Sequence, residues 1–146
     1  MNLIFKSVDQ YDILFLYALF KERTKYPKEI RTEPKDIPSL NKHTQFVLSF
    51  LNSKEHNYKS WDIIIADGQK VGALVLKKDG EWGYHVSMNH WNMGIGQRAL
   101  AWLIEQNPTM RLIANIKTGN FTAQHIAEKL GHKLVSYTYI REPSVT

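Results

Sequence analysis

Two glycines, Gly94 and Gly96, separate a strand-like segment from a helix-like segment, and no other feature of the chain constrains its fold as much. Residues 81–87 have the mixed, aromatic character of a strand, whereas apolar residues recur at helical spacing from Gly96 to Glu105. Backbone N–H groups at the start of a helix have no partner within it, and with the positive end of the helix dipole they form a seat for phosphate. The turn therefore predicts an anion site at residues 92–97.

Two other phosphate-binding motifs also use a glycine turn, but this chain lacks the flanking residues that each of them requires. The run from Gly94 to Ala99 formally satisfies the dinucleotide fingerprint G-x-G-x-x-G/A, which also requires a hydrophobic parallel strand before it and a later acidic residue. The preceding strand is mixed in polarity, and the next strand-like segment, 111–116, carries no carboxylate. A P-loop would need Gly-Lys-Ser/Thr after the glycines. Taken alone, the pair is a tight turn between a strand and a helix.

A second capped helix, which begins after Asn120 and ends at Gly131, narrows the choice. With the glycine turn, the informative residues are Gly94, Gly96, Asn120, Ala123, Glu128, Lys129, Leu130 and Gly131. This pattern resembles the GNAT superfamily of N-acetyltransferases. Their core is a strand, an R/Q-x-x-G-x-G/A turn that holds the coenzyme A pyrophosphate, a helix, a strand, and a helix of the form N-x-x-(S/A)-x-x-x-Y-E-K-x-G-F.

The chain departs from the family pattern at three positions. Trp91 stands where the family usually has Arg or Gln, Ala127 where it often has the tyrosine that protonates the leaving thiolate, and His132 where it has Phe. The first departure leaves the backbone seat intact, and the second removes the obvious general acid. Tyr137 and Tyr139 alternate with polar residues on the expected last strand, which favours packing roles, although either one would supply a hydroxyl.

The predicted elements follow the order of the GNAT fold, so we expect a single acetyltransferase domain over residues 1–146. The expected fold class is α/β (α+β), with a mixed, mostly antiparallel, twisted sheet of about six to seven strands flanked by about four helices. Asp67-Gly68 predicts a tight hairpin turn. The expected strands are 3–8, 61–66, 70–76, 81–87, 111–116 and the segment after Gly131, and the expected helices follow Asp9, span 43–51, follow Gly96 and follow Asn120.

Composition and charge limit the remaining classes. The 146 residues, 43% of them hydrophobic, are enough for one sizeable core. The absence of cysteine excludes disulfides and thiolate chemistry and fits the cytoplasm, and no apolar run is long enough to span a membrane. The net charge of +5 is scattered, which favours a small anionic ligand over nucleic acid. The histidines lack metal-ligand spacing, so no metal is expected.

The resemblance implies acetyl-CoA as co-substrate. In the family the pantetheine arm pairs like an extra strand with the backbone before the glycine turn, and the pyrophosphate lies on the turn itself. The expected cofactor-binding residues are Val86, Met88, Asn92, Met93, Gly94, Ile95, Gly96, Gln97 and Asn120.

Direct acetyl transfer requires that an amine lose a proton and that the developing oxyanion be stabilised. The backbone N–H of Val86 is expected to face the thioester oxygen. Glu81 and His85 share a strand face, because they lie four apart in a period of two, and they are the expected proton acceptors. His85 is expected to titrate near neutrality. A base acting through water stays open, as do structural roles for both residues.

The charged segment 21–41 is broken by prolines and is long for an idle loop, so it is expected to contact the acceptor. Arg23 and Arg31 would bind an anionic substrate, and Trp61 and Tyr84 would offer aromatic faces. This half loosely resembles GNAT members that acetylate amino-sugar nucleotides, although Arg-rich first halves also occur in enzymes acetylating protein N-termini. Transfer to a primary amine of an amino-sugar nucleotide is thus expected, with protein or peptide amines as the alternative.

Two further hypotheses come from other classes. A basic nucleic-acid-binding module would use Trp61, Trp82 and Trp91 for stacking, but it has no need of the glycine turn followed by an Asn-capped helix. An acyltransferase fold that has lost catalysis stays open because of Ala127. A homodimer is compatible with the sequence.

Overall fold

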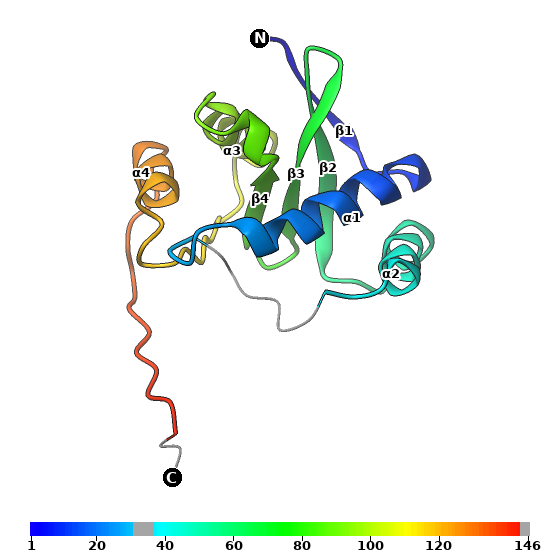
Figure 1. Ribbon diagram of the computed structural model, residues 1–146. Helices are drawn as coiled ribbons and strands as arrows, with labels where there is room; N and C mark the ends of the chain where they lie inside the picture. The colour runs from blue at the N-terminus through cyan, green and yellow to red at the C-terminus, as the bar shows by residue number, and fades with distance from the viewer. Residues whose placement is uncertain (31–36, 144–146) are drawn as a thin grey trace.

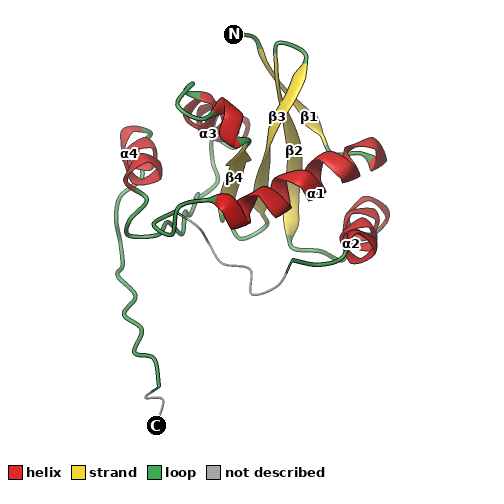
Figure 2. Ribbon diagram, viewed as in Figure 1, coloured by secondary structure: helices red, strands yellow, loops and turns green. Residues whose placement is uncertain are grey.

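The computed structural model of the chain describes residues 1–30 and 37–143. Arg31, expected in the acceptor loop, lies outside these described residues. The described chain forms a four-stranded antiparallel sheet with helices on both faces, as Figures 1 and 2 show. The strands lie in chain order and span Leu3–Ser7 (β1), Tyr58–Ala66 (β2), Gln69–Lys77 (β3) and Trp82–Val86 (β4).

Four α-helices in the described part of the chain cover this sheet. They are Ile13–Glu22 (α1), Leu40–Asn52 (α2), Ile95–Gln106 (α3) and Phe121–Lys129 (α4), with short 3-10 helices at Gln10–Asp12 (η1), Arg23–Lys25 (η2) and Met88–His90 (η3). Helices α1 and α2 lie on one face, where Leu16 and Val47 pack around Ile63. Helices α3 and α4 lie on the opposite face (Figure 1). The four helices and the mostly antiparallel sheet confirm the predicted fold class.

The alternation of side chains along the strands determines which residues face which pair of helices. Ile63 and Ile64, neighbours on β2, are both fully buried because each face of the strand is covered, the first by α1 and α2 and the second by α3 and α4. On β4, Trp82 belongs to the α3 side. His85 pairs with Ala73, which faces α1 and α2, so His85 projects from that face of the sheet.

The Asp67-Gly68 turn joins β2 to β3. Both residues have positive φ, 48° at Asp67 and 82° at Gly68. Two central residues of positive φ are typical of the primed turn that matches the twist of a hairpin. The predicted hairpin is therefore confirmed.

The sheet is smaller than the six to seven strands expected. Residues 111–116 form no strand, and only a parallel bridge between Ile113 and Glu81 joins them to the start of β4. The Trp82 N–H donates to the Ile113 carbonyl at 3.0 Å, and the Ile113 N–H donates to the Gly80 carbonyl at 2.9 Å. The bridge does not extend, so the outer edge of β4 is covered only at its first residues.

The expected last strand is also wrong for the described residues. Residues 133–143 are extended, lie in no sheet, and run away from the body of the protein, as Figure 1 shows. Tyr137 and Tyr139 are 70% and 92% exposed, so the expectation that they pack in the fold is corrected. The physical reason is that the incomplete strand at 111–116 offers this segment no regular edge to pair with.

Candidate active site

The N-terminus of α3 is the centre of the candidate site. Gly94 is its N-cap residue and has the left-handed φ of 76°, and the Arg98 N–H donates to the Gly94 carbonyl at 3.1 Å to start the helix. No side chain of the described residues caps this end. The N–H groups of the first turn therefore have no partner inside the helix, as the sequence predicts.

The turn before α3 is open to solvent. Asn92, like Gly94, has positive φ, at 63°, and both residues are exposed. A Cβ built on Gly94 would meet no atom within 4 Å, so the space in front of it is open. Met93 is 51% exposed, whereas Ile95 is buried and anchors the helix start in the core. Exposed backbone in front of an anchored helix dipole suits an anion.

Gly96 has a different structural reason from Gly94. A Cβ at Gly96 would lie 2.8 Å from the ring of Tyr84, so the missing side chain makes room for that ring. Tyr84 in turn stacks on Trp82, with ring centroids 5.9 Å apart and ring planes 9° apart. Burial raises the pKa of the Tyr84 hydroxyl. The expectation that Tyr84 offers a free aromatic face to the acceptor is thereby corrected.

The outer edge of β4 carries the backbone of Val86. The Lys77 N–H donates to Glu81 and the Ser87 N–H donates to Val71, so the odd-numbered residues of this segment bond to β3. In an antiparallel ladder the alternate residues point the other way, which directs the N–H and carbonyl of Val86 to the outer edge. This is the side on which a thioester oxygen would be met.

Two side chains contact the Val86 carbonyl. The indole N–H of Trp91 donates to it at 2.7 Å, and the Tyr26 hydroxyl lies 3.5 Å away. The rings of Tyr26 and Trp91 meet edge to face, with centroids 5.0 Å apart. Trp91, the residue found in place of the family's Arg or Gln, therefore fastens the turn to the end of β4.

The end of α1 reaches the same place. Glu22, the last residue of the helix, accepts a hydrogen bond from the Met88 N–H through its Oε1 atom. The Met88 N–H is thus already bonded within the protein, whereas the outward-facing Val86 N–H has no hydrogen-bond partner among the described residues. Sequence reasoning missed Glu22, Tyr26 and Trp91 as site residues.

His85 differs from the expectation. It is half-buried, and burial, together with the nearby Arg23 charge, lowers its pKa from 6.5 to about 4. The prediction that it titrates near neutrality is therefore wrong. At neutral pH the imidazole is uncharged and is a weak proton acceptor.

Glu81 shares the strand face of His85 but lies at the opposite end of β4. Its carboxylate is 3.6 Å from the Lys77 ammonium. Five residues of extended chain separate it from Val86, which is about 17 Å at the usual rise per residue. The structure therefore does not bring Glu81 together with the helix start.

Trp61 lies in the core. It is 9% exposed and meets the rings of Phe46 and Phe50 edge to face, with centroids 5.9 and 5.2 Å away. The expectation that Trp61 stacks on an acceptor is corrected, because helix α2 already covers its ring. Arg23 is half-buried, with its guanidinium 5.5 Å from the centre of the Phe20 ring, and burial lowers its pKa.

Asn120 caps α4. Its side-chain oxygen accepts from the Ala123 N–H at 3.1 Å, which confirms the predicted cap. At the other end of this helix, the His132 ring accepts a hydrogen bond from the Trp82 indole N–H at 3.0 Å. The position where the family has Phe is thus occupied by a polar ring that fastens α4 to β4.

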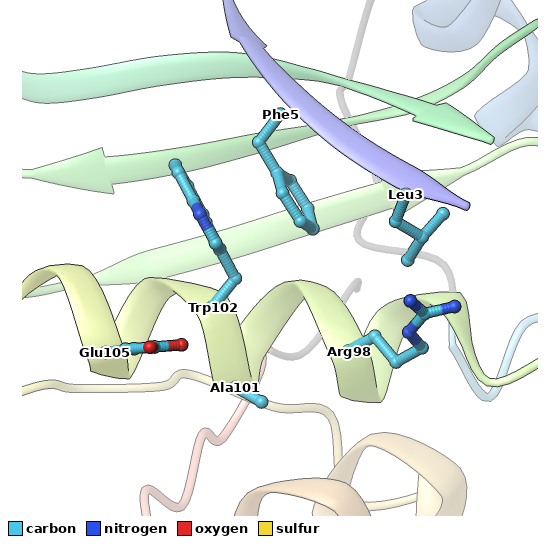
Figure 3. A pocket seen from close by; sticks show the side chains of 6 residues that line it. All are labelled: Leu3, Phe5, Arg98, Ala101, Trp102 and Glu105. Atoms are coloured by element: carbon cyan, nitrogen blue, oxygen red, sulfur yellow. The ribbon is translucent and has the colours of Figure 1, made fainter. Parts of the chain in front are cut away.

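A shallow pocket of about 260 Å³ lies between β1 and α3, as Figure 3 shows. Its lining side chains are Leu3, Phe5, Arg98, Ala101, Trp102 and Glu105. Phe5 and Trp102 stack at 4.4 Å, and the Arg98 guanidinium donates to the Met1 carbonyl at 3.0 Å. None of the residues predicted for the site lines this pocket.

In the described part of the chain, no group of three or more His, Asp or Glu residues is placed to hold a metal ion. Nor is any described helix both long enough and apolar enough to cross a membrane.

Comparisons with known proteins identify relatives of this arrangement. The family model described as an acetyltransferase (GNAT) domain matches residues 2–133. No curated protein sequence matches the chain.

Solved structures with the same fold include three acetyltransferases. A GNAT-family acetyltransferase from Streptococcus pneumoniae has a TM-score of 0.68 at 19% identity, with 89% of this chain and 84% of that chain covered. A ribosomal-protein-alanine N-acetyltransferase from Brucella melitensis has a TM-score of 0.68 at 20% identity, with 88% of this chain and 83% of that chain covered. A phosphinothricin acetyltransferase from Sinorhizobium meliloti, solved with acetyl-CoA, has a TM-score of 0.73 at 15% identity, with 93% of this chain and 77% of that chain covered.

Proposed function

The chain belongs to the GNAT family of acetyltransferases, and we propose that it transfers an acetyl group from acetyl-CoA directly to a primary amine. The observation that carries the proposal is the uncapped N-terminus of α3, with left-handed Gly94 and open space in front of it, close to the outward-facing N–H of Val86. The structural relative from Sinorhizobium meliloti was solved with acetyl-CoA, which is in keeping with this choice of co-substrate.

The residues of the turn fit the pyrophosphate. The backbone of residues 92–97 would hold it, because residues 92–94 are exposed and the turn lies at the positive end of the α3 dipole. The pantetheine arm would lie along the outer edge of β4 at Val86. Met88 would take part less directly, since its N–H is bonded to Glu22.

Acetyl-CoA supplies a thioester whose carbonyl accepts an amine and whose sulfur leaves. The Val86 N–H would donate to the oxyanion that forms on that carbonyl, and the proposal is supported by its direction toward the outer edge of the strand. Trp91 and Tyr26 contact the Val86 carbonyl, which belongs to the following peptide group, and so help to fix the residue that carries this N–H. A donor fixed in this way would need little reorganisation when charge develops.

For the acceptor, we propose a small amine that carries negative charge, as in an amino-sugar nucleotide. The support is the basic segment that begins at Arg23, next to the end of β4, and the net charge of +5. Trp61 and Tyr84 are packed inside the protein and do not offer a face for a stacked sugar or base. Protein and peptide amines are the alternative, and a cytoplasmic location, where acetyl-CoA is available, belongs to the same proposal.

The test is an amine screen with labelled acetyl-CoA. The panel holds 3-amino and 4-amino nucleotide sugars, the corresponding free amino sugars, and peptides with free N-termini. We expect transfer to the nucleotide sugars, weakened by salt because the recognition is electrostatic. If peptides were acetylated and nucleotide sugars were not, the proposed acceptor would be wrong and the proposed reaction would stand. If the protein bound no acetyl-CoA, the proposed function itself would be rejected.

A further inference from the structure

Glu22 lies at the candidate site because the end of α1 contacts the segment that follows β4. It ends α1, and its Oε1 atom accepts from the N–H of Met88, which lies 66 residues later. Met88 is two residues beyond Val86, whose N–H lies on the strand edge. The carboxylate is therefore fixed next to the position where the thioester would lie.

The surroundings of Glu22 leave its charge available to a ligand. It is half-buried, and no ion pair joins it to any residue of the described part of the chain. The Glu22 charge also acts on Tyr26. Burial is the main cause and the Glu22 charge the second cause of the raised pKa of the Tyr26 hydroxyl, which is about 12. Tyr26 therefore stays protonated and does not compete for a proton.

The other proton acceptors near β4 are less suited. Glu81 is paired with Lys77 at the far end of the strand, and His85 is neutral with its pKa lowered to about 4. Among the carboxylates of the described residues, Glu22 is the one hydrogen-bonded to the backbone that follows Val86.

We propose that the Glu22 carboxylate binds the ammonium group of the acceptor and takes its proton, an inference that rests on the proposed acetyl transfer. The ammonium gives one proton to Glu22, and the freed lone pair on nitrogen forms the bond to the thioester carbon. The carbon–sulfur bond then breaks, and its electron pair stays on sulfur. The second proton lost by nitrogen passes to sulfur to give the thiol, and Glu22 releases its proton to water.

The test compares three substitutions in the full chain. Glu22→Gln keeps the length of the side chain and an oxygen that accepts from the Met88 N–H, but it removes the charge. Glu22→Asp keeps the charge and shortens the side chain. Glu29→Gln removes an exposed negative charge seven residues further on and is the matched control. For each protein, kcat/KM for the best amine of the screen is measured with saturating acetyl-CoA, and the affinity for acetyl-CoA is measured by calorimetry.

We expect Glu22→Gln to lower kcat/KM for the amine by about 100-fold or more, since this is the usual contribution of a positioned base. Its acetyl-CoA affinity should stay within roughly twofold of the parent, and Glu22→Asp should keep more activity than Glu22→Gln. A residue that only anchors Met88 would give the reverse order, because Gln keeps that hydrogen bond.

Two results would overturn the inference. Glu22→Gln with nearly parental kcat/KM, in a parent protein that acetylates amines, would remove Glu22 from the reaction and leave the proposed function standing. If the parent protein bound no acetyl-CoA, both the role of Glu22 and the proposed acetyl transfer would be rejected.

Discussion

The ring of Tyr84 occupies the space that a side chain at Gly96 would need, with 2.8 Å between the ring and a Cβ built on the glycine. The second glycine of the turn is therefore required by packing between β4 and α3, whereas the first, Gly94, faces open space. This contact joins the strand before the turn to the helix after it. It also separates the two glycines experimentally, because one substitution should affect stability and the other should affect binding.

Gly96→Ala should destabilise the fold by about 1–3 kcal/mol, the usual cost of overpacking. In a helix, Gly→Ala is otherwise stabilising by roughly 0.5–1 kcal/mol. In a Tyr84→Leu background, which removes the crowded ring atoms, the same substitution should therefore be neutral or stabilising. Urea denaturation of the four proteins of this cycle measures the coupling. Equal effects in both backgrounds would contradict the contact.

Gly94→Val should weaken acetyl-CoA binding by roughly tenfold or more, which is at least 1.4 kcal/mol. The β-branched side chain would stand in the open space before α3 and disfavour the left-handed φ of 76°. Gly68→Val is the matched control, since Gly68 also has positive φ and no neighbour within 4 Å of a built Cβ, but lies in the β2–β3 turn. Both variants should lose similar stability, and calorimetry should show lost affinity only for Gly94→Val. Unchanged affinity would remove the phosphate seat from this turn.

His85 should make stability depend on pH. Its pKa is lowered from 6.5 to about 4 in the folded protein, so its contribution is present above pH 6.5 and is lost as the pH falls toward 4. Linkage gives roughly 2 kcal/mol between pH 7 and pH 4.5. His85→Gln should therefore lose less stability over this range than the parent protein. A titration of the His85 ring by NMR with a midpoint near 6.5 would contradict the prediction.

Asp12 should be the carboxylate most important for stability near the start of the sheet. It is fully buried, 2.8 Å from the Lys6 ammonium and 2.6 Å from that of Lys70. Burial raises its pKa, but the hydrogen bonds from Lys6 and Lys70 outweigh this, so the pKa lies below its ordinary 3.8. The stability it contributes is present above pH 3.8 and is lost as the pH falls through the lower, folded value.

Asp12→Asn should accordingly cost about 3 kcal/mol at pH 7, because it leaves the lysines without their buried partner. Asp9→Asn is the control. Asp9 is half-exposed, shares Lys6 as its partner and keeps its capping role as Asn, so the loss should be under about 1 kcal/mol. Equal losses in chemical denaturation would show that burial does not matter here.

The sequence predicts the elements whose signals are local. The Asp67-Gly68 turn, the start of α3 at Gly94 and the Asn120 cap all depend on neighbouring residues, and the structure confirms all three. Turn and cap signals follow from φ preferences and short-range hydrogen bonds, which do not depend on the rest of the fold.

The contacts that complete the candidate site follow from tertiary packing instead. Glu22 meets Met88 across 66 residues, and no periodicity relates the two. Trp61 is predicted correctly as a strand residue, but the sequence around it does not indicate that α2 covers the Trp61 ring. The pKa of His85 likewise depends on burial and on Arg23, neither of which is visible along the strand.

The free segment 133–143 has a consequence for handling the protein. Val135, Tyr137 and Tyr139 are exposed on an extended backbone, and the outer edge of β4 is bridged only at its start. Unpaired strand edges and apolar extended segments associate between molecules by β pairing. The net charge of +5 opposes that association by repulsion, which salt screens. Concentrated solutions should therefore aggregate as ionic strength rises, which light scattering would detect, and removal of the segment should prevent it.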